Sequence, residues 1–119
     1  MLKLRVSIVF LAALTASAQS PAKNGKEMFE KRCGGCHALD RDKEGPRLGD
    51  VYGREAGTVA TFEYSAALKK SKLTWTGEAL DKWIADPEKL VPDTDMGFHV
   101  ENADERRGII GYLKQKAGK

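Results

Sequence analysis

The chain has 119 residues, of which 41% are hydrophobic and 31% are charged, as expected for one globular domain. Its formal net charge is +3. Without the first 18 residues, which carry Lys3 and Arg5 and no acidic residue, the charge falls to +1. This near neutrality argues against nucleic acid or an anionic membrane surface as a partner.

The beginning of the chain predicts a secretory signal peptide over residues 1–18. Lys3 and Arg5 precede a short apolar run over residues 6–14, and Ala16-Ser17-Ala18 follows as a small-residue cleavage site. The run is too short to cross a bilayer, which takes about 20 apolar residues. We therefore expect a periplasmic mature domain over residues 19–119, without membrane insertion.

The first half of the mature chain predicts one helix followed by a long loop. Asn24 and Glu27 form a capping-box pattern, which starts a helix that runs through Phe29 to Cys33. Residues 38–63 contain four glycines and a proline, a composition typical of loops.

The second half predicts three helices and one more loop. A short helix covers residues 65–70, and another begins near Thr76 and ends at Asp86 because Pro87 follows. A loop covers residues 89–102, and the last helix begins at Asn102, with Glu105 three residues on. No alternating apolar pattern predicts a strand, so we expect an all-α fold.

These short helices offer only a thin core. A domain of about 100 residues buries roughly two thirds of the surface that its unfolded chain exposes, and glycine-rich loops contribute little to such burial. Something else should therefore fill the centre of the fold.

The most informative motif is Cys33-x-x-Cys36-His37, the attachment signature of c-type haem. Two thiols three positions apart can add to the two vinyl groups along one side of a porphyrin. The adjacent imidazole can then bind the iron as the proximal ligand. The motif therefore predicts one covalently bound haem c, attached through Cys33 and Cys36.

Three other roles for the motif are weaker. A disulfide between Cys33 and Cys36 would close a very small loop and leave His37 unexplained. A thioredoxin-like redox pair needs a βαβ context, which the sequence does not show. A zinc site needs four ligands, and beyond the motif His99 is the only remaining histidine or cysteine.

The second face of the iron needs a ligand or stays open. Met28 lies one turn before Cys33 on the same helix and cannot easily reach that face. Met96 is the favoured ligand, because it stands in a polar loop with no apolar helix face to join. A thioether there would stabilise ferrous iron and raise the reduction potential. His99, three residues on, is the competing ligand.

At this point the sequence resembles the class I cytochromes c, the small type found in mitochondria and bacteria. The resemblance covers nearly the whole mature chain. Its segments, in order, are GKEMFEKRCGGCH, GPRLGDVYGREAG, FEYSAALKKSKLTWT, ADPEKLVPDTDMGF and ADERRGIIGYLK. It implies the cytochrome c fold, in which short helices and loops wrap around one haem.

The resemblance also implies roles for single residues. His37 and Met96 would ligate the iron, and the Pro46 carbonyl would accept a hydrogen bond from His37. Arg54, Tyr64 and Trp75 would hold a buried propionate, and Thr94 would support the other one. Gly25 and Phe29 would meet Ile109 and Tyr112 where the first and last helices cross. The haem pocket would be lined by Leu48, Leu80, Ile84 and Phe98.

The chain departs from the family pattern at several positions. Trp83 replaces a tyrosine near the bound methionine, and Leu68 replaces an asparagine that orders water. Members of the family often ring the exposed haem edge with lysines. The matching neighbourhood here holds Arg32 and Lys89, but also the acids Glu88, Asp93, Asp95 and Glu101.

The function implied is one-electron transfer by a soluble monohaem carrier that is not an enzyme. We expect a monomer that docks briefly with donor and acceptor redox proteins at the exposed haem edge, as weak redox encounters do. Two alternatives remain. One is a haem subunit of a periplasmic dehydrogenase complex, and the other is a haem peroxidase or gas sensor if Met96 is not a stable ligand.

Overall fold

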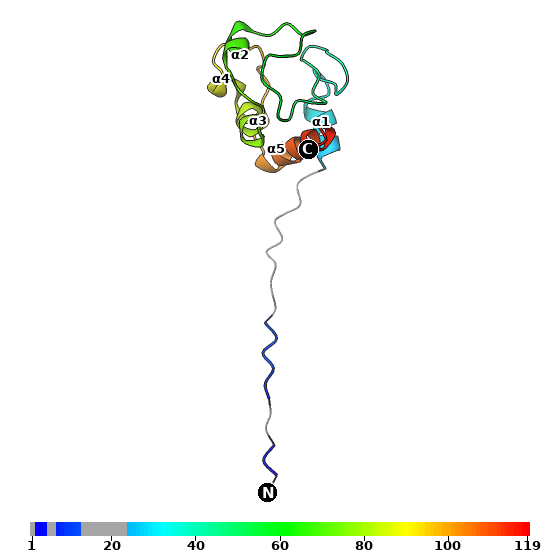
Figure 1. The fold of residues 1–119 in the computed structure, drawn as a ribbon, viewed down its shortest axis with the longest axis vertical. Helices are drawn as coiled ribbons and strands as arrows, with labels where there is room; N and C mark the ends of the chain where they lie inside the picture. Colours follow the sequence, from blue (N-terminus) through cyan, green and yellow to red (C-terminus); the bar gives the residue numbers. More distant parts are fainter. Residues whose placement is uncertain (1, 5–6, 13–23) are drawn as a thin grey trace.

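The computed structural model describes residues 2–4, 7–12 and 24–119. Within these residues the chain forms helices and loops, and the one β pairing is an isolated bridge between Glu55 and Thr74. The all-α expectation is therefore confirmed (Figure 1). The helices are α1 (Gly25–Arg32), α2 (Ala66–Lys70), α3 (Gly77–Ala85), α4 (Pro87–Leu90) and α5 (Ala103–Lys116).

Helices α1, α2, α3 and α5 begin where the polar capping residues predict. At each start a side-chain oxygen accepts a hydrogen bond from the backbone N–H three residues on, which satisfies one of the free donors of the first turn. The pairs are Asn24 with Glu27 (3.3 Å), Ser65 with Leu68 (3.1 Å), Thr76 with Ala79 (3.1 Å) and Asn102 with Glu105 (3.0 Å).

The start of the predicted loop over residues 89–102 is wrong, because α4 occupies Pro87–Leu90. The Asp86 side chain accepts a hydrogen bond from the Lys89 N–H at 3.2 Å and caps this helix. Proline ends α3 as expected, but its fixed φ also suits the first position of a new helix, where no N–H is needed. The loop therefore begins at Val91.

Helices α1 and α5 cross at one end of the molecule, where Figure 1 shows them side by side with α3 next to α5. A Cβ on Gly25 would collide with the Gly108 carbonyl oxygen and lie 2.8 Å from Cβ of Tyr112. The Phe29 and Tyr112 rings are 5.5 Å apart, and Ile109 is fully buried. The predicted contact of Gly25 and Phe29 with the last helix is confirmed, and Gly108 completes it.

The predicted signal peptide stays a prediction. Its cleavage site at Ala18 lies outside the described residues. Among the helices of the described ranges, none combines the length and the apolar character that crossing a bilayer takes.

Candidate cofactor site

A cavity of about 760 Å³ lies between the loops, the end of α1 and the inner sides of α3 and α5. Apolar side chains form much of its wall, as is typical of cofactor sites. The structure brings every predicted site residue to this wall: Cys33, Cys36, His37, Pro46, Arg54, Tyr64, Trp75, Trp83, Thr94, Met96 and Phe98.

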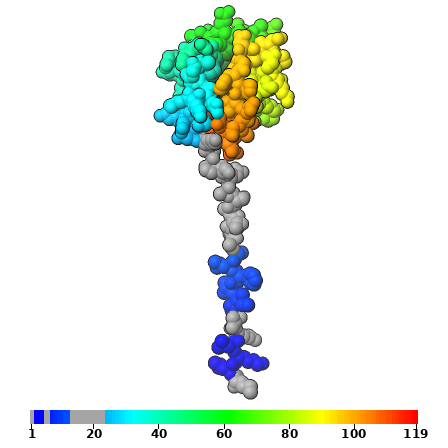
Figure 2. Space-filling view, turned by 180° about the vertical axis from the view of Figure 1, so that it is seen from behind, coloured from blue at the N-terminus to red at the C-terminus, as the bar shows by residue number. Residues whose placement is uncertain are grey.

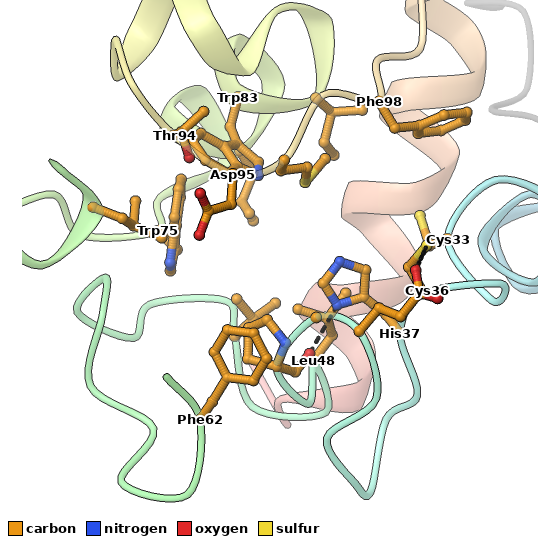
Figure 3. Close-up of a pocket in the computed structure, with 18 of the residues that line it drawn as sticks. Cys33, Cys36, His37, Leu48, Phe62, Trp75, Trp83, Thr94, Asp95 and Phe98 are labelled. Atoms are coloured by element: carbon orange, nitrogen blue, oxygen red, sulfur yellow. Dashed lines mark hydrogen bonds between the residues drawn. The ribbon is translucent and has the colours of Figure 1, made fainter. Parts of the chain in front are cut away.

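The motif forms a tight turn directly after α1. The N–H groups of Cys36 and His37 both donate to the Cys33 carbonyl, at 3.2 and 2.9 Å. Both thiols are free, with Cys33 half-buried and Cys36 exposed, so the structure holds no disulfide between them. The turn places both thiols and the imidazole along one edge of the cavity (Figure 3).

The surroundings of the two thiols raise the pKa of each. Burial, together with the charge of Cys36, raises the pKa of Cys33 to about 11. A hydrogen bond to Glu44, at 3.3 Å from Sγ to Oε2, raises the pKa of Cys36.

The His37 ring is fixed by its neighbours. Its Nδ1 lies 2.8 Å from the Pro46 carbonyl oxygen. A carbonyl can only accept, so Nδ1 carries the proton and Nε2 keeps its lone pair. Any side chain at Gly45 would collide with the ring. Burial lowers the pKa of His37, and the charges of Lys43 and Arg54 act in the same direction against the Pro46 hydrogen bond. The ring therefore has the neutral form that binds metals.

Arg54 brings a positive charge to the cavity wall. Its Nη1 donates to Asp50 at 2.7 Å and its Nη2 to the Arg47 carbonyl at 3.1 Å. Its Nε is buried and has no hydrogen-bond partner within the described residues. The hydroxyl of Tyr64, which also lines the cavity, accepts from the Val59 N–H at 3.1 Å, and this leaves its own proton to donate. A buried donor without a partner is costly, so this corner favours an anionic ligand group.

The wall that faces His37 is aromatic. The Trp75 and Trp83 rings are 5.2 Å apart, and Trp83, Thr94 and Asp95 lie across the cavity from His37 (Figure 3). Phe98 stands on the same side near Cys33 (Figure 3).

The three candidates for the second iron ligand differ in position. Met96 lines the cavity and is half-buried. His99 has a side chain 53% exposed and lies in a neighbouring groove rather than on the cavity wall. Met28 is buried on α1 within the helix core. Only Met96 is therefore placed to meet a group inside the cavity.

Comparison with known proteins settles the family. The family model described as "Cytochrome c" matches residues 22–116. This chain belongs to the cytochrome c family.

The relatives include cytochrome c 2.1 of Caenorhabditis briggsae, which is 41% identical over 100 residues and covers 82% of this chain and 89% of its own length. Cytochrome c of Euglena viridis is 41% identical over 96 residues, covering 78% of this chain and 94% of its own. Among solved structures, cytochrome cH from Methylobacterium extorquens superposes with a TM-score of 0.74 at 38% identity and covers 81% of this chain and 99% of its own. The matches therefore cover nearly the whole length of each of these relatives.

Cytochromes c bind haem c covalently, and the cavity fits that group. The free thiols at its edge, the free Nε2 of His37 and the unpartnered Nε of Arg54 match the vinyl, iron and carboxylate groups of a haem. The described residues contain no cluster of three or more His, Cys, Asp or Glu arranged for a metal ion, so the four ligands of the zinc alternative are not assembled there.

The structure adds wall residues that the sequence did not single out. Phe62 lines the cavity and packs edge-on against Tyr64, with ring centroids 4.9 Å apart. Its aromatic side chain, two positions before Tyr64, was the signal in the sequence that could have suggested this role. Leu48, Leu80 and Ile84 line the cavity as expected, and so does Leu68. The further lining residues include Gly45, Val51, Glu63, Asp95, Ile109 and Leu113.

Proposed function

We propose that this cytochrome c carries single electrons between redox proteins, with the haem iron held by His37 and Met96. The observation that carries the proposal is the His37–Pro46 hydrogen bond of 2.8 Å, which leaves Nε2 free for the iron. Met96 is the one methionine among the cavity-lining residues of the described chain. Haem supplies the chemistry, which is reversible one-electron reduction and oxidation of its iron.

The residues around the cavity suit electron transfer, which needs no substrate site at the iron. Ligands on both faces would leave the iron no open position for a substrate. The buried side chains of Trp75, Leu80 and Ile84 give the cavity an apolar wall. Apolar groups reorient little when the charge of the iron changes, which favours electron transfer over catalysis.

The test is a Met96→Ala variant with Met28→Leu as a matched control. Loss of the Met96 thioether should lower the midpoint potential and let carbon monoxide bind the ferrous protein. The Met28→Leu change conserves volume within the helix core and should leave both properties unchanged. An unchanged potential in the Met96 variant would contradict this ligand assignment.

The wild-type protein distinguishes the alternatives. A ferric methionine-to-iron charge-transfer band, together with no response to carbon monoxide, would support a carrier. Carbon monoxide binding by the wild type would instead favour a peroxidase or gas sensor. Co-elution with a dehydrogenase in gel filtration from the native host would favour a bound subunit.

We further propose that the protein works in the periplasm as a monomer after cleavage behind Ala18. The charged residues Lys3 and Arg5 and the apolar run that follows support export. The mass of the protein from a periplasmic extract tests this, because it should equal residues 19–119 plus one haem.

A further inference from the structure

The segment that carries Met96 also carries an unusual surface charge. Four exposed acids lie between residues 88 and 101 and are opposed by the single lysine Lys89, in a chain whose formal charge is +3. We call these acids the acidic face: Glu88, Asp93, Asp95 and Glu101. Figure 2 shows this part of the chain, in yellow to orange, beside the cyan residues around the haem-attachment motif.

The acidic face adjoins the cavity. Asp95 lines the cavity itself, and the Asp93 N–H donates to Glu88 Oε1 at 3.1 Å. Glu101 lines a polar groove of about 460 Å³, which shares Arg32 with the cavity wall. The acidic face therefore has one residue on the cavity wall and one in the groove beside it, while Glu88 and Asp93 are joined to each other.

Positive charge at the same place is largely neutralised. Arg32 Nε lies 3.0 Å from Glu105 Oε2, and its Nη2 lies 3.3 Å from Glu105 Oε1. Besides Asp95, the cavity wall carries three exposed charged residues, the cation Lys31 and the acids Glu44 and Glu63. The rim is therefore net negative although the chain as a whole is positive.

Phe98 gives this surface an apolar centre. Its side chain is 49% exposed, and within residues 24–119 it is the one large hydrophobic residue that is exposed. It lines the cavity close to Cys33 (Figure 3). An exposed aromatic residue inside a charged rim is the usual composition of a protein interface.

We propose that the acidic face, with Phe98 at its centre, docks a redox protein whose own docking surface is rich in lysine and arginine. This proposal rests on the electron-transfer function proposed above. Opposite charges accelerate encounter and orient the partners, and here they would bring the partner to the cavity mouth, where the electron path is shortest. The expected partner has the opposite sign to the acidic partners that a lysine ring would select.

A binding experiment on the haem-loaded protein tests the charge directly. We would titrate it with pentalysine and with pentaglutamate at low ionic strength and follow backbone and Phe98 ring NMR shifts. Pentalysine should shift Phe98 and residues 93–101, and salt should abolish the shifts. Pentaglutamate should shift none of these residues.

Two triple variants each remove three negative charges, one on the acidic face and the other elsewhere on the surface. Glu88→Gln/Asp93→Asn/Glu101→Gln removes three of the four charges of the acidic face and keeps Asp95, which lines the cavity. Asparagine tolerates the positive φ of 65° at Asp93. Glu27→Gln/Glu55→Gln/Glu78→Gln neutralises three exposed acids that line neither the cavity nor the groove. The first variant should bind pentalysine about threefold to tenfold more weakly and the second within about twofold of wild type.

Electron exchange with small probes separates this proposal from the proposed function. Oxidation of the ferrous protein by the cation tris(phenanthroline)cobalt(III) should slow as salt rises, whereas oxidation by ferricyanide should not. A protein that exchanges electrons with neither probe would refute the carrier function. Faster exchange with ferricyanide at low salt, or Phe98 shifts with pentaglutamate, would refute only the basic partner. Shifts that depend on protein concentration alone would instead indicate a second copy on this face and would also overturn the proposal.

Discussion

The crossing of α1 and α5 and the loop-walled cavity are stabilised in different ways. At the crossing the chain packs on itself, with Gly25 against Gly108 and Phe29 against Tyr112. At the cavity, apolar walls face one another across about 760 Å³ and their loops are tied by hydrogen bonds such as that from the Leu48 N–H to the Ala38 carbonyl at 2.9 Å. The difference shows that one region is complete as a polypeptide, whereas the other is completed by haem.

Removing the haem attachment should produce the largest difference in stability between the cavity loops and the helix crossing. In a Cys33→Ala/Cys36→Ala variant, the cavity walls lose the group that they pack against, so amide hydrogen exchange should increase most over residues 38–64 and 91–98. The crossing of α1 and α5, where Gly25 packs against Gly108, should keep the most protection. Mass spectrometry should show the chain without bound haem. A uniform loss of protection would mean that the crossing also depends on haem.

The crossing itself is tested by Gly25→Ala. The added Cβ would collide with the Gly108 carbonyl, which should lower the free energy of unfolding by about 1–3 kcal/mol. The matched control is Gly111→Ala on exposed α5 surface, where no atom lies within 4 Å of the added Cβ. It should raise stability by about 0.5–1 kcal/mol. Denaturant unfolding measures both, and equal signs would contradict the close packing.

The Arg32–Glu105 pair joins the last residue of α1 to α5 at the point where the crossing meets the cavity wall, because Arg32 also lines the cavity. The Glu105 side chain is only 11% exposed, so Glu105→Gln should lower the free energy of unfolding by about 1–2 kcal/mol. The control is Glu78→Gln, which breaks an exposed 3.1 Å pair with Lys82 and should change stability by less than about 0.5 kcal/mol. Equal effects in the two variants would show that burial does not strengthen the Arg32 pair.

The smallest effect concerns Asp42, which ties together distant parts of the long loop between α1 and α2. Its carboxylate accepts from the Thr61 hydroxyl at 2.6 Å and the Arg47 N–H at 3.0 Å, and these bonds lower its pKa. A pKa lowered by folding gives stability that is present above the ordinary value of 3.8 and is lost as pH falls through the lower folded value. In Asp42→Asn the melting temperature should therefore fall less steeply below pH 3.8 than in wild type. Identical pH slopes would show that these bonds do not favour the ionised form.

Local signals in the sequence were enough to predict most of the fold. Polar caps at Asn24, Ser65, Thr76 and Asn102 act on the next three residues alone, so they can be recognised without tertiary structure. The helix α4 was missed because Pro87 both ends one helix and starts another. The cysteines and the histidine of the motif are likewise close in sequence, and the pocket residues followed from the family resemblance.

By itself the sequence determined where most helices begin, which residues attach the cofactor and that the loops need something to pack against. These depend on neighbours along the chain and on amino-acid composition. Only the tertiary structure decided that Gly108 receives Gly25, that Asp42 binds both Thr61 and Arg47, and that the Nε of Arg54 is buried without a hydrogen-bond partner among the described residues. Most of these contacts join residues that are distant in sequence, such as Gly25 with Gly108 and Asp42 with Thr61. No local pattern specifies them, because they form only when the loops close around a shared core.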